Sequence, residues 1–197
     1  MLLRCTQKFL TELRLKKNDI TFYPKAAHPL DEWYAHVFTL YPRRKCMVFA
    51  HAGTMFSFFA LDIKRGDLAN PGAFFRTRLG RALFDENYPQ AVIEVFNRHT
   101  KEIRVTSTID RVMIGTINRM VLDLRFFGNE SERAMFRNEA VMGAHFRRGS
   151  YLAFPGSPMN RMRDMLLRLE ELQGVEIPGP LSDKMIGAHL KVDSIHF

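Results

Sequence analysis

Residues 33–51, WYAHVFTLYPRRKCMVFAH, decide the fold. Two apolar stretches flank a basic turn over 42–45, which is typical of two antiparallel strands joined by a tight hairpin. Both faces of the first stretch carry mainly apolar side chains. Strands of this kind occupy the middle of a sheet that is covered on both sides. The sequence therefore predicts a central hairpin covered by other elements.

The turn also determines which residues of the two strands oppose each other. With Arg43 and Arg44 as the two loop residues, His36 opposes His51 on one face of the hairpin. Two histidines placed in this way come within reach of a shared metal ion or of acid–base chemistry. A register shift by one residue would separate them. The alternative interpretation is a pair of half-buried strand histidines without a chemical role.

Strands and helices continue in a mixed order on both sides of this hairpin. The expected strands span 1–5, 33–41, 46–50, 55–61 and 101–107, and the expected helices span 7–15, 71–84, 110–127, 131–146 and 158–173, with one more from about residue 89. This order predicts an α+β fold, with a mainly antiparallel sheet covered by helices and a helical C-terminal part. We expect a single domain over 1–173, followed by a C-terminal tail over 174–197.

The composition excludes several classes of protein. With 197 residues, 46% apolar and 25% charged, the chain is neither disordered, fibrous nor a small disulfide-stapled domain. The two cysteines, Cys5 and Cys46, form no C-x-x-C motif, which indicates a reducing cytoplasm. The longest uncharged run, 46–61, has 16 residues, and a membrane helix needs about 20. We therefore expect a cytoplasmic protein without a membrane partner.

The net charge of +8 is concentrated in the first third of the chain. Residues 1–66 carry 11 basic and 5 acidic side chains, an excess of +6. The densest basic run is Arg43, Arg44 and Lys45 in the predicted turn. Together with Lys8, and with Tyr34 for stacking on bases, this run predicts a binding site for nucleic acid or another anion. The alternative is an ordinary solvated loop.

Several short motifs, in their order and spacing, resemble a known family. They are Arg4-Cys5-Thr6-x-Lys8, Trp33-x-Ala35, Arg44-Lys45-Cys46 with Phe49 and His51, and the segment 110–118. They resemble an uncharacterised bacterial family, a domain of unknown function, whose members read R-C-T-x-K, W-x-A, R-K-C-x-x-F-x-[HN] and N-R-S-V-L-G-S-M-N. The resemblance covers residues 1–125. Asp110 stands where the family pattern has Asn, and Val112 where it has Ser. The resemblance implies one compact bacterial domain and supplies no catalytic residues.

Two arginines within these motifs are candidate ligands for a phosphate or carboxylate. Arg4 and Arg111 each lie beside an apolar element and could form such a pocket with Thr6 and Asn118. The alternative for each arginine is a structural ion pair. The sequence contains no recognisable metal-ligand motif, nucleophile elbow, phosphate loop or dinucleotide fingerprint. We therefore expect no metal and no cofactor.

The function expected first is that of a non-enzymatic binding module of the bacterial cytoplasm. Its partner would be anionic, either nucleic acid or an acidic protein, in a toxin–antitoxin or phage-defence context. One alternative is a small hydrolase or nuclease with His36, His51, Arg4 and Arg111 around a pocket. Another is a structural subunit that docks through the helix 158–173 and the tail, so that residues 158–197 would contact an oligomer or protein partner.

Overall fold

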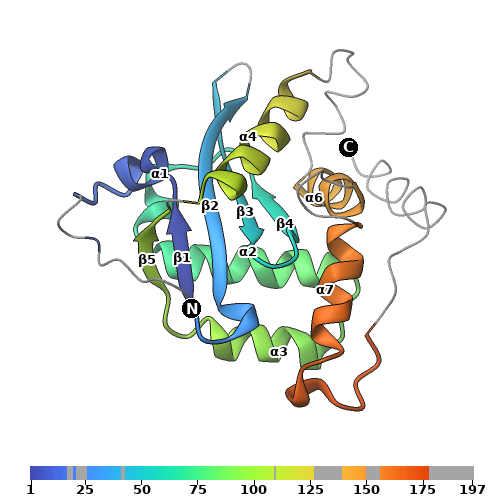
Figure 1. Ribbon diagram of the computed structural model, residues 1–197. Helices are drawn as coiled ribbons and strands as arrows, with labels where there is room; N and C mark the ends of the chain where they lie inside the picture. Colours follow the sequence, from blue (N-terminus) through green and yellow to red (C-terminus); the bar gives the residue numbers. More distant parts are fainter. Residues whose placement is uncertain are drawn as a thin grey trace, which may run out of the picture.

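The structure is a computed structural model and describes residues 1–16, 20, 26–40, 43–108, 110–126, 139–149 and 156–177 (Figure 1). The strands are β1 (Leu2–Cys5), β2 (Glu32–Leu40), β3 (Arg44–His51), β4 (Ser57–Ala60) and β5 (Arg104–Ser107). The helices are α1 (Gln7–Glu12), α2 (Pro71–Asp85), α3 (Gln90–His99), α4 (Arg111–Phe126), α6 (Glu139–Arg148) and α7 (Pro158–Leu166). Three short 3₁₀ turns are η2 (Pro29–Asp31), η3 (Arg65–Leu68) and η4 (Glu170–Leu172).

The five strands form one mixed sheet in the order β4-β3-β2-β1-β5. The pairs β2–β3 and β3–β4 are antiparallel. The pairs β1–β2 and β1–β5 are parallel. The α+β class is confirmed, whereas the expected mainly antiparallel sheet is corrected to a mixed one. The reason is that helices intervene between β1 and β2 and between β4 and β5, so the chain returns to each later strand in the direction of β1.

Helices cover both faces of the sheet (Figure 1). Successive side chains of β2 and β3 point to opposite faces, and each face has its own core cluster. One cluster joins the sheet to α1, α2, α3 and α7, and its larger members include Leu10, Trp33, Phe49, Phe58, Phe75, Phe96 and Met162. The other joins the sheet to α4 and α6 and includes Phe38, Val48, Phe59, Met113, Met120, Met142 and Phe146. The hairpin is therefore central, as its apolar faces predict.

Trp33 is the largest side chain at the centre of the first cluster. Its indole is fully buried, and its ring lies edge-on to those of Phe56, Phe75 and Phe96 at centroid distances of 5.3–6.5 Å. Its Nε1 atom donates a hydrogen bond of 2.9 Å to the carbonyl oxygen of Leu30. The indole thus satisfies its polar group while it joins η2, the sheet and two helices.

The register of the central hairpin differs from the predicted one. Leu40 opposes Arg44, and Trp33 opposes His51, so the loop contains residues 41–43 rather than Arg43 and Arg44. Arg43 adopts a positive φ of 105°, and its N–H group donates to the carbonyl oxygen of Leu40 at 2.8 Å. Three-residue hairpin loops commonly contain one residue with positive φ. The register change is an odd number of residues, which exchanges the faces of one strand relative to the other.

Most helix boundaries follow local sequence signals. Asn70 caps α2 by accepting the N–H of Ala73 at 2.9 Å, and Pro71 occupies the first helical position. The apolar residue Phe84 near the end of this helix is 64% exposed. It lies on the outer side of α2 because the buried stripe runs through Phe75, Leu79, Ala82 and Leu83.

The C-terminal helix is shorter than its sequence pattern suggests. Instead of continuing to residue 173, α7 ends at Leu166, and a turn leads to η4. Its apolar stripe packs into the first core cluster rather than facing outward. Ile177 is also buried in that cluster. The apolar side of α7 is therefore already packed against the core and is not exposed for docking a partner. The part of the predicted tail beyond residue 177 lies outside the described residues.

Candidate functional site

The open end of the hairpin is held in place by two ion pairs. Lys45 contacts Glu12 of α1 at 2.7 Å, and Arg44 contacts Asp62 at 2.5 Å. The Arg44 guanidinium holds the pKa of Asp62 below its usual value, chiefly through the hydrogen bond. The N–H of Ile63 also donates to the carbonyl oxygen of Lys45 at 2.9 Å. These contacts join α1 and the segment after β4 to the same end of the sheet.

Six basic side chains are exposed around this end, and we call them the basic hairpin end. They are Lys8, Arg14, Lys16, Arg43, Lys64 and Arg65. Lys8 lies one helical turn before Glu12, and therefore on the same side of α1. Figure 1 shows α1 toward the hairpin end of the sheet and α3 at the opposite end.

The described acidic residues of the same part of the chain have partners of their own. The described acidic residues within 1–66 are Glu12, Asp31, Glu32 and Asp62, and each of them contacts another basic or histidine side chain. Glu12 and Asp62 thus pair with Lys45 and Arg44 at the same end of the sheet, where the exposed Asp67 also accepts the N–H of Lys64 at 2.8 Å. Among the described residues of this third, the positive excess found in the sequence is consequently displayed on the surface.

Of the predicted anion-binding residues, Arg43 and Lys8 are exposed and belong to the basic hairpin end. Arg44 and Lys45 are partly exposed and support that end through their ion pairs. Tyr34 lies elsewhere. It is only 4% exposed and faces α4, where its hydroxyl group donates to Asp110 at 3.4 Å. Tyr34 is thus not available for stacking on a base, because its strand position faces the second core cluster.

The arginine candidates have separate environments. Arg4 is 4% exposed on β1, and its Nε atom contacts Glu32 at 2.5 Å. Arg111 is exposed in the first turn of α4. Asp110 occupies the start of that helix and accepts the N–H groups of Val112 and Met113 at 2.9 and 3.0 Å. For Arg4, the geometry corresponds to the alternative that the sequence left open, a structural ion pair.

The predicted histidine pair does not form. His36 opposes Val48, and His51 opposes Trp33, which places the two imidazoles on opposite faces of the sheet. The predicted His36–His51 pairing is therefore wrong, and so is the pocket that required both rings. The physical reason is the three-residue loop, which shifts the strands by an odd number of positions.

Each of these histidines has a hydrogen-bond partner. The Nδ1 atom of His36 lies 3.0 Å from the hydroxyl of Thr6. His51 is fully buried, and its Nδ1 and Nε2 atoms lie 3.0 Å from the Thr54 hydroxyl and 2.8 Å from the Pro29 carbonyl oxygen. Burial lowers the pKa of His51 to about 4. A neutral, hydrogen-bonded ring of this kind organises the turn between β3 and β4.

A group of possible metal ligands lies at the opposite end of the molecule, and the sequence gives no sign of it. Among the described residues, His28, His99 and Glu171 place one ligand atom each within 4.8 Å of the others. They come from the N-cap of η2, from α3 and from η4, and are at least 70 residues apart along the chain. No short spacing motif joins them, so pattern matching could not have found the group.

Comparison with models of protein families shows which family the chain belongs to. The family model of a domain of unknown function, DUF6933, matches residues 2–145. The chain belongs to this family. The prediction of an uncharacterised domain family is thus confirmed, and the DUF6933 match extends beyond residue 125 to include α4 and much of α6. A comparison with curated proteins finds no match. Within the described part of the chain, no helix has the length and apolar composition of a membrane span.

Proposed function

We propose that this DUF6933 protein is a non-enzymatic binding module that contacts nucleic acid through the basic hairpin end. The observation that carries the proposal is that six exposed cations lie on the hairpin loop, on and just after α1, and before α2, segments that Lys45 joins at one end of the sheet through Glu12 and Ile63. Exposed lysine and arginine side chains on a protruding element are suited to contact successive phosphates.

The contacts would be made to the phosphate backbone rather than to bases. Trp33, Tyr34 and Phe38, the aromatic residues of β2, are 0%, 4% and 1% exposed. Base recognition in single strands relies on accessible aromatic faces, and these rings do not provide them. The proposal is therefore sequence-independent binding, with a duplex as the preferred form because it presents closely spaced phosphates.

We propose the bacterial cytoplasm as the compartment. Cys5 and Cys46 are both free and buried, and burial raises the pKa of each thiol. Thiols in this state are small apolar core side chains rather than disulfide partners. This arrangement supports a reducing environment.

The test compares two double variants that change the charge equally. Lys8→Glu with Arg43→Glu reverses two cations of the basic hairpin end. Lys101→Glu with Arg168→Glu reverses two exposed cations outside it, near the end of α3 and after α7. Lys8 is the second residue of α1, where an acidic replacement is compatible with the helix dipole.

Binding to fluorescent duplex DNA and duplex RNA is measured by anisotropy at low salt. We expect the first double variant to lose at least about tenfold in affinity, since two phosphate contacts are removed. We expect a much smaller loss for the second. Equal losses would show that only the net charge matters and would overturn the assignment of the surface. Binding to polyglutamate but not to either duplex would overturn the nucleic-acid partner and favour an acidic protein.

A further inference from the structure

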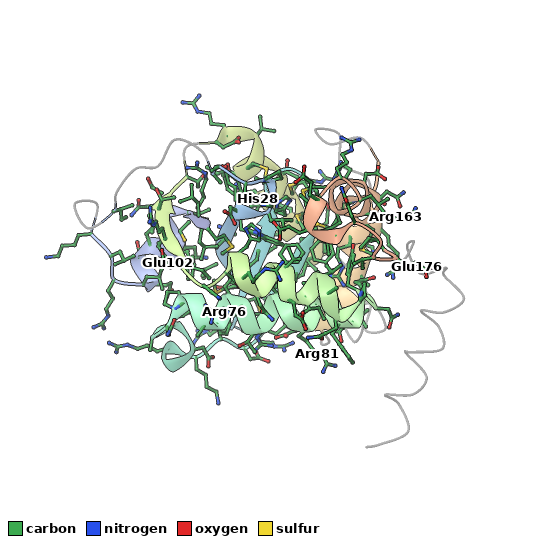
Figure 2. The ribbon with its side chains drawn as sticks, turned by 90° about the horizontal axis from the view of Figure 1, so that it is seen from below. His28, Arg76, Arg81, Glu102, Arg163 and Glu176 are labelled. Carbon is green, nitrogen blue, oxygen red and sulfur yellow. The ribbon has the colours of Figure 1, made fainter. Side chains whose placement is uncertain are left out.

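His28, His99 and Glu171 converge at the end of the molecule that carries α3. The Oε1 atom of Glu171 lies 3.5 Å from Nε2 of His99 and 3.8 Å from Nε2 of His28. The two imidazole rings are stacked, with centroids 4.1 Å apart and an interplanar angle of 26°. Figure 2 views the molecule from this end and labels His28. One nitrogen of each ring and one oxygen of Glu171 therefore lie within 4.8 Å of one another.

Neighbouring side chains hold two of these groups, His99 and Glu171, in place. The Nδ1 atom of His99 lies 2.9 Å from Oδ1 of Asp31, a carboxylate that holds the ring with its Nε2 edge toward Glu171. The Nη2 atom of Arg98 holds Oε2 of Glu171 at 3.0 Å and leaves Oε1 toward the histidines. A carboxylate behind a histidine is the common support of a metal-binding imidazole.

The position of His99 is itself fixed. Arg76, labelled in Figure 2, donates from Nη2 to the carbonyl oxygen of Thr100 at 2.6 Å and thereby anchors the end of α3 to α2. His28 and Glu171 are more adaptable, because their side chains are 28% and 37% exposed, against 17% for His99. One ligand is thus held rigidly, and the other two can adjust to an ion.

We propose that His28, His99 and Glu171 form a binding site for one first-row divalent transition metal ion, with zinc the best match. Two imidazole nitrogens and one carboxylate oxygen are a suitable donor set for zinc. Bonds of about 2.0–2.1 Å in a tetrahedron place ligand atoms about 3.3 Å apart. The separations from Glu171 are a few tenths of an ångström longer, and the exposed side chains can close them. Water would complete the coordination.

Metal binding has a structural consequence at His28. In the structure, its Nδ1 atom accepts the N–H of Leu30 at 3.2 Å, so the ring proton is on Nε2. Coordination through Nε2 requires the neutral tautomer with the proton on Nδ1. The ring therefore exchanges its proton between the two nitrogens through solvent and gives up the hydrogen bond from Leu30. This exchange lowers the affinity relative to a preorganised site and provides a signal at the Leu30 amide.

The ion would connect η2, α3 and η4, which are far apart in the chain. Glu171 lies beyond the region that matches DUF6933. The site is thus completed by the C-terminal part of this particular chain. Its ligands lie outside the basic hairpin end, so the inference is independent of the proposed nucleic-acid binding.

The test uses the full chain after treatment with a chelator and dialysis. Zinc is titrated by calorimetry, and the Leu30 amide and the histidine rings are followed by NMR. We expect one ion per chain, with shifts at Leu30, His28 and His99. Glu171→Gln should weaken zinc binding by at least about tenfold. Glu170→Gln changes the neighbouring exposed carboxylate and should leave binding unchanged.

Several outcomes would overturn the site. They are the absence of saturable binding at several-fold excess of zinc, equal effects of the two glutamate variants, and full binding by a His28→Gln, His99→Gln double variant. The last result would assign the ion to other histidines of the chain. Far-ultraviolet circular dichroism of each variant without zinc shows whether it is folded. A Glu171→Gln variant that fails to fold is replaced by Glu171→Ala in the same comparison.

Discussion

The Nε2 atom of His51 donates a hydrogen bond of 2.8 Å to the carbonyl oxygen of Pro29, 22 residues earlier in the chain. This bond joins the turn after β3 to η2, beneath the buried ring of Trp33, whose centroid lies 5.0 Å from that of His51. The ring is neutral, because burial lowers its pKa to about 4. The stability of the fold therefore depends on pH through this group.

We expect the free energy of unfolding to fall as the pH is lowered from 6.5 to 4. In this window the unfolded chain protonates His51, whose ordinary pKa is 6.5, while the folded chain does not. The contribution of neutral His51 to the free energy of unfolding is fully present above pH 6.5 and amounts to about 3 kcal/mol at most. Urea unfolding at several pH values measures it. His51→Gln removes the titrating group, so its stability should vary less with pH, and identical slopes for both proteins would contradict this role.

A buried ion pair predicts a large loss of stability. The side chains of Arg147 and Glu86 are 1% and 2% exposed, and Arg147 also donates from Nη1 to the carbonyl oxygen of Ser57 at 2.8 Å. Glu86→Gln leaves the guanidinium charge buried without its carboxylate and should cost about 3–5 kcal/mol. The double variant Glu86→Gln with Arg147→Met should cost less than the sum of the two single changes. An additive result in denaturant unfolding would show that the pair is not coupled.

The packing around Arg147 gives a further test at Gly143 on α6. A Cβ atom added there would clash with Nη1 of Arg147, which its partners hold in place. Gly143→Ala should therefore destabilise the protein by about 1–3 kcal/mol. Gly115→Ala on α4 is the matched control, because a Cβ there meets no atom within 4 Å. It should stabilise the helix by about 0.5–1 kcal/mol. Thermal unfolding of both variants measures these effects. Equal midpoints for the two variants would contradict the predicted clash at Gly143.

Local patterns were sufficient to predict much of the fold. The apolar residues Met113, Ile117, Met120, Val121 and Leu124 are all buried along α4, as their spacing predicts. Asn70 and Pro71 indicate the start of α2 correctly. These signals depend on neighbouring residues along one element, where helix geometry alone fixes which side chains share a face.

Interactions between distant segments could not be predicted in the same way. The hairpin register depends on whether Arg43 adopts a positive φ, and the sequence of this loop does not indicate that. The direction of β1 relative to β2 and β5 depends on how the intervening helices pack. The group of His28, His99 and Glu171 requires three elements to be brought together in the folded chain. The exposure of the basic residues was easier to predict, because lysine and arginine side chains are rarely buried.

The salt dependence of duplex binding tests the proposed function most directly. Neutralising a phosphate releases counterions, and log K falls with log salt at a slope of about −0.9 per contact. If at least three of the six cations of the basic hairpin end contact phosphates, the slope for the unmodified protein should be about −2.7 or steeper. A slope near zero, or no detectable binding to duplex DNA or RNA at the lowest salt, would contradict nucleic-acid binding by this surface.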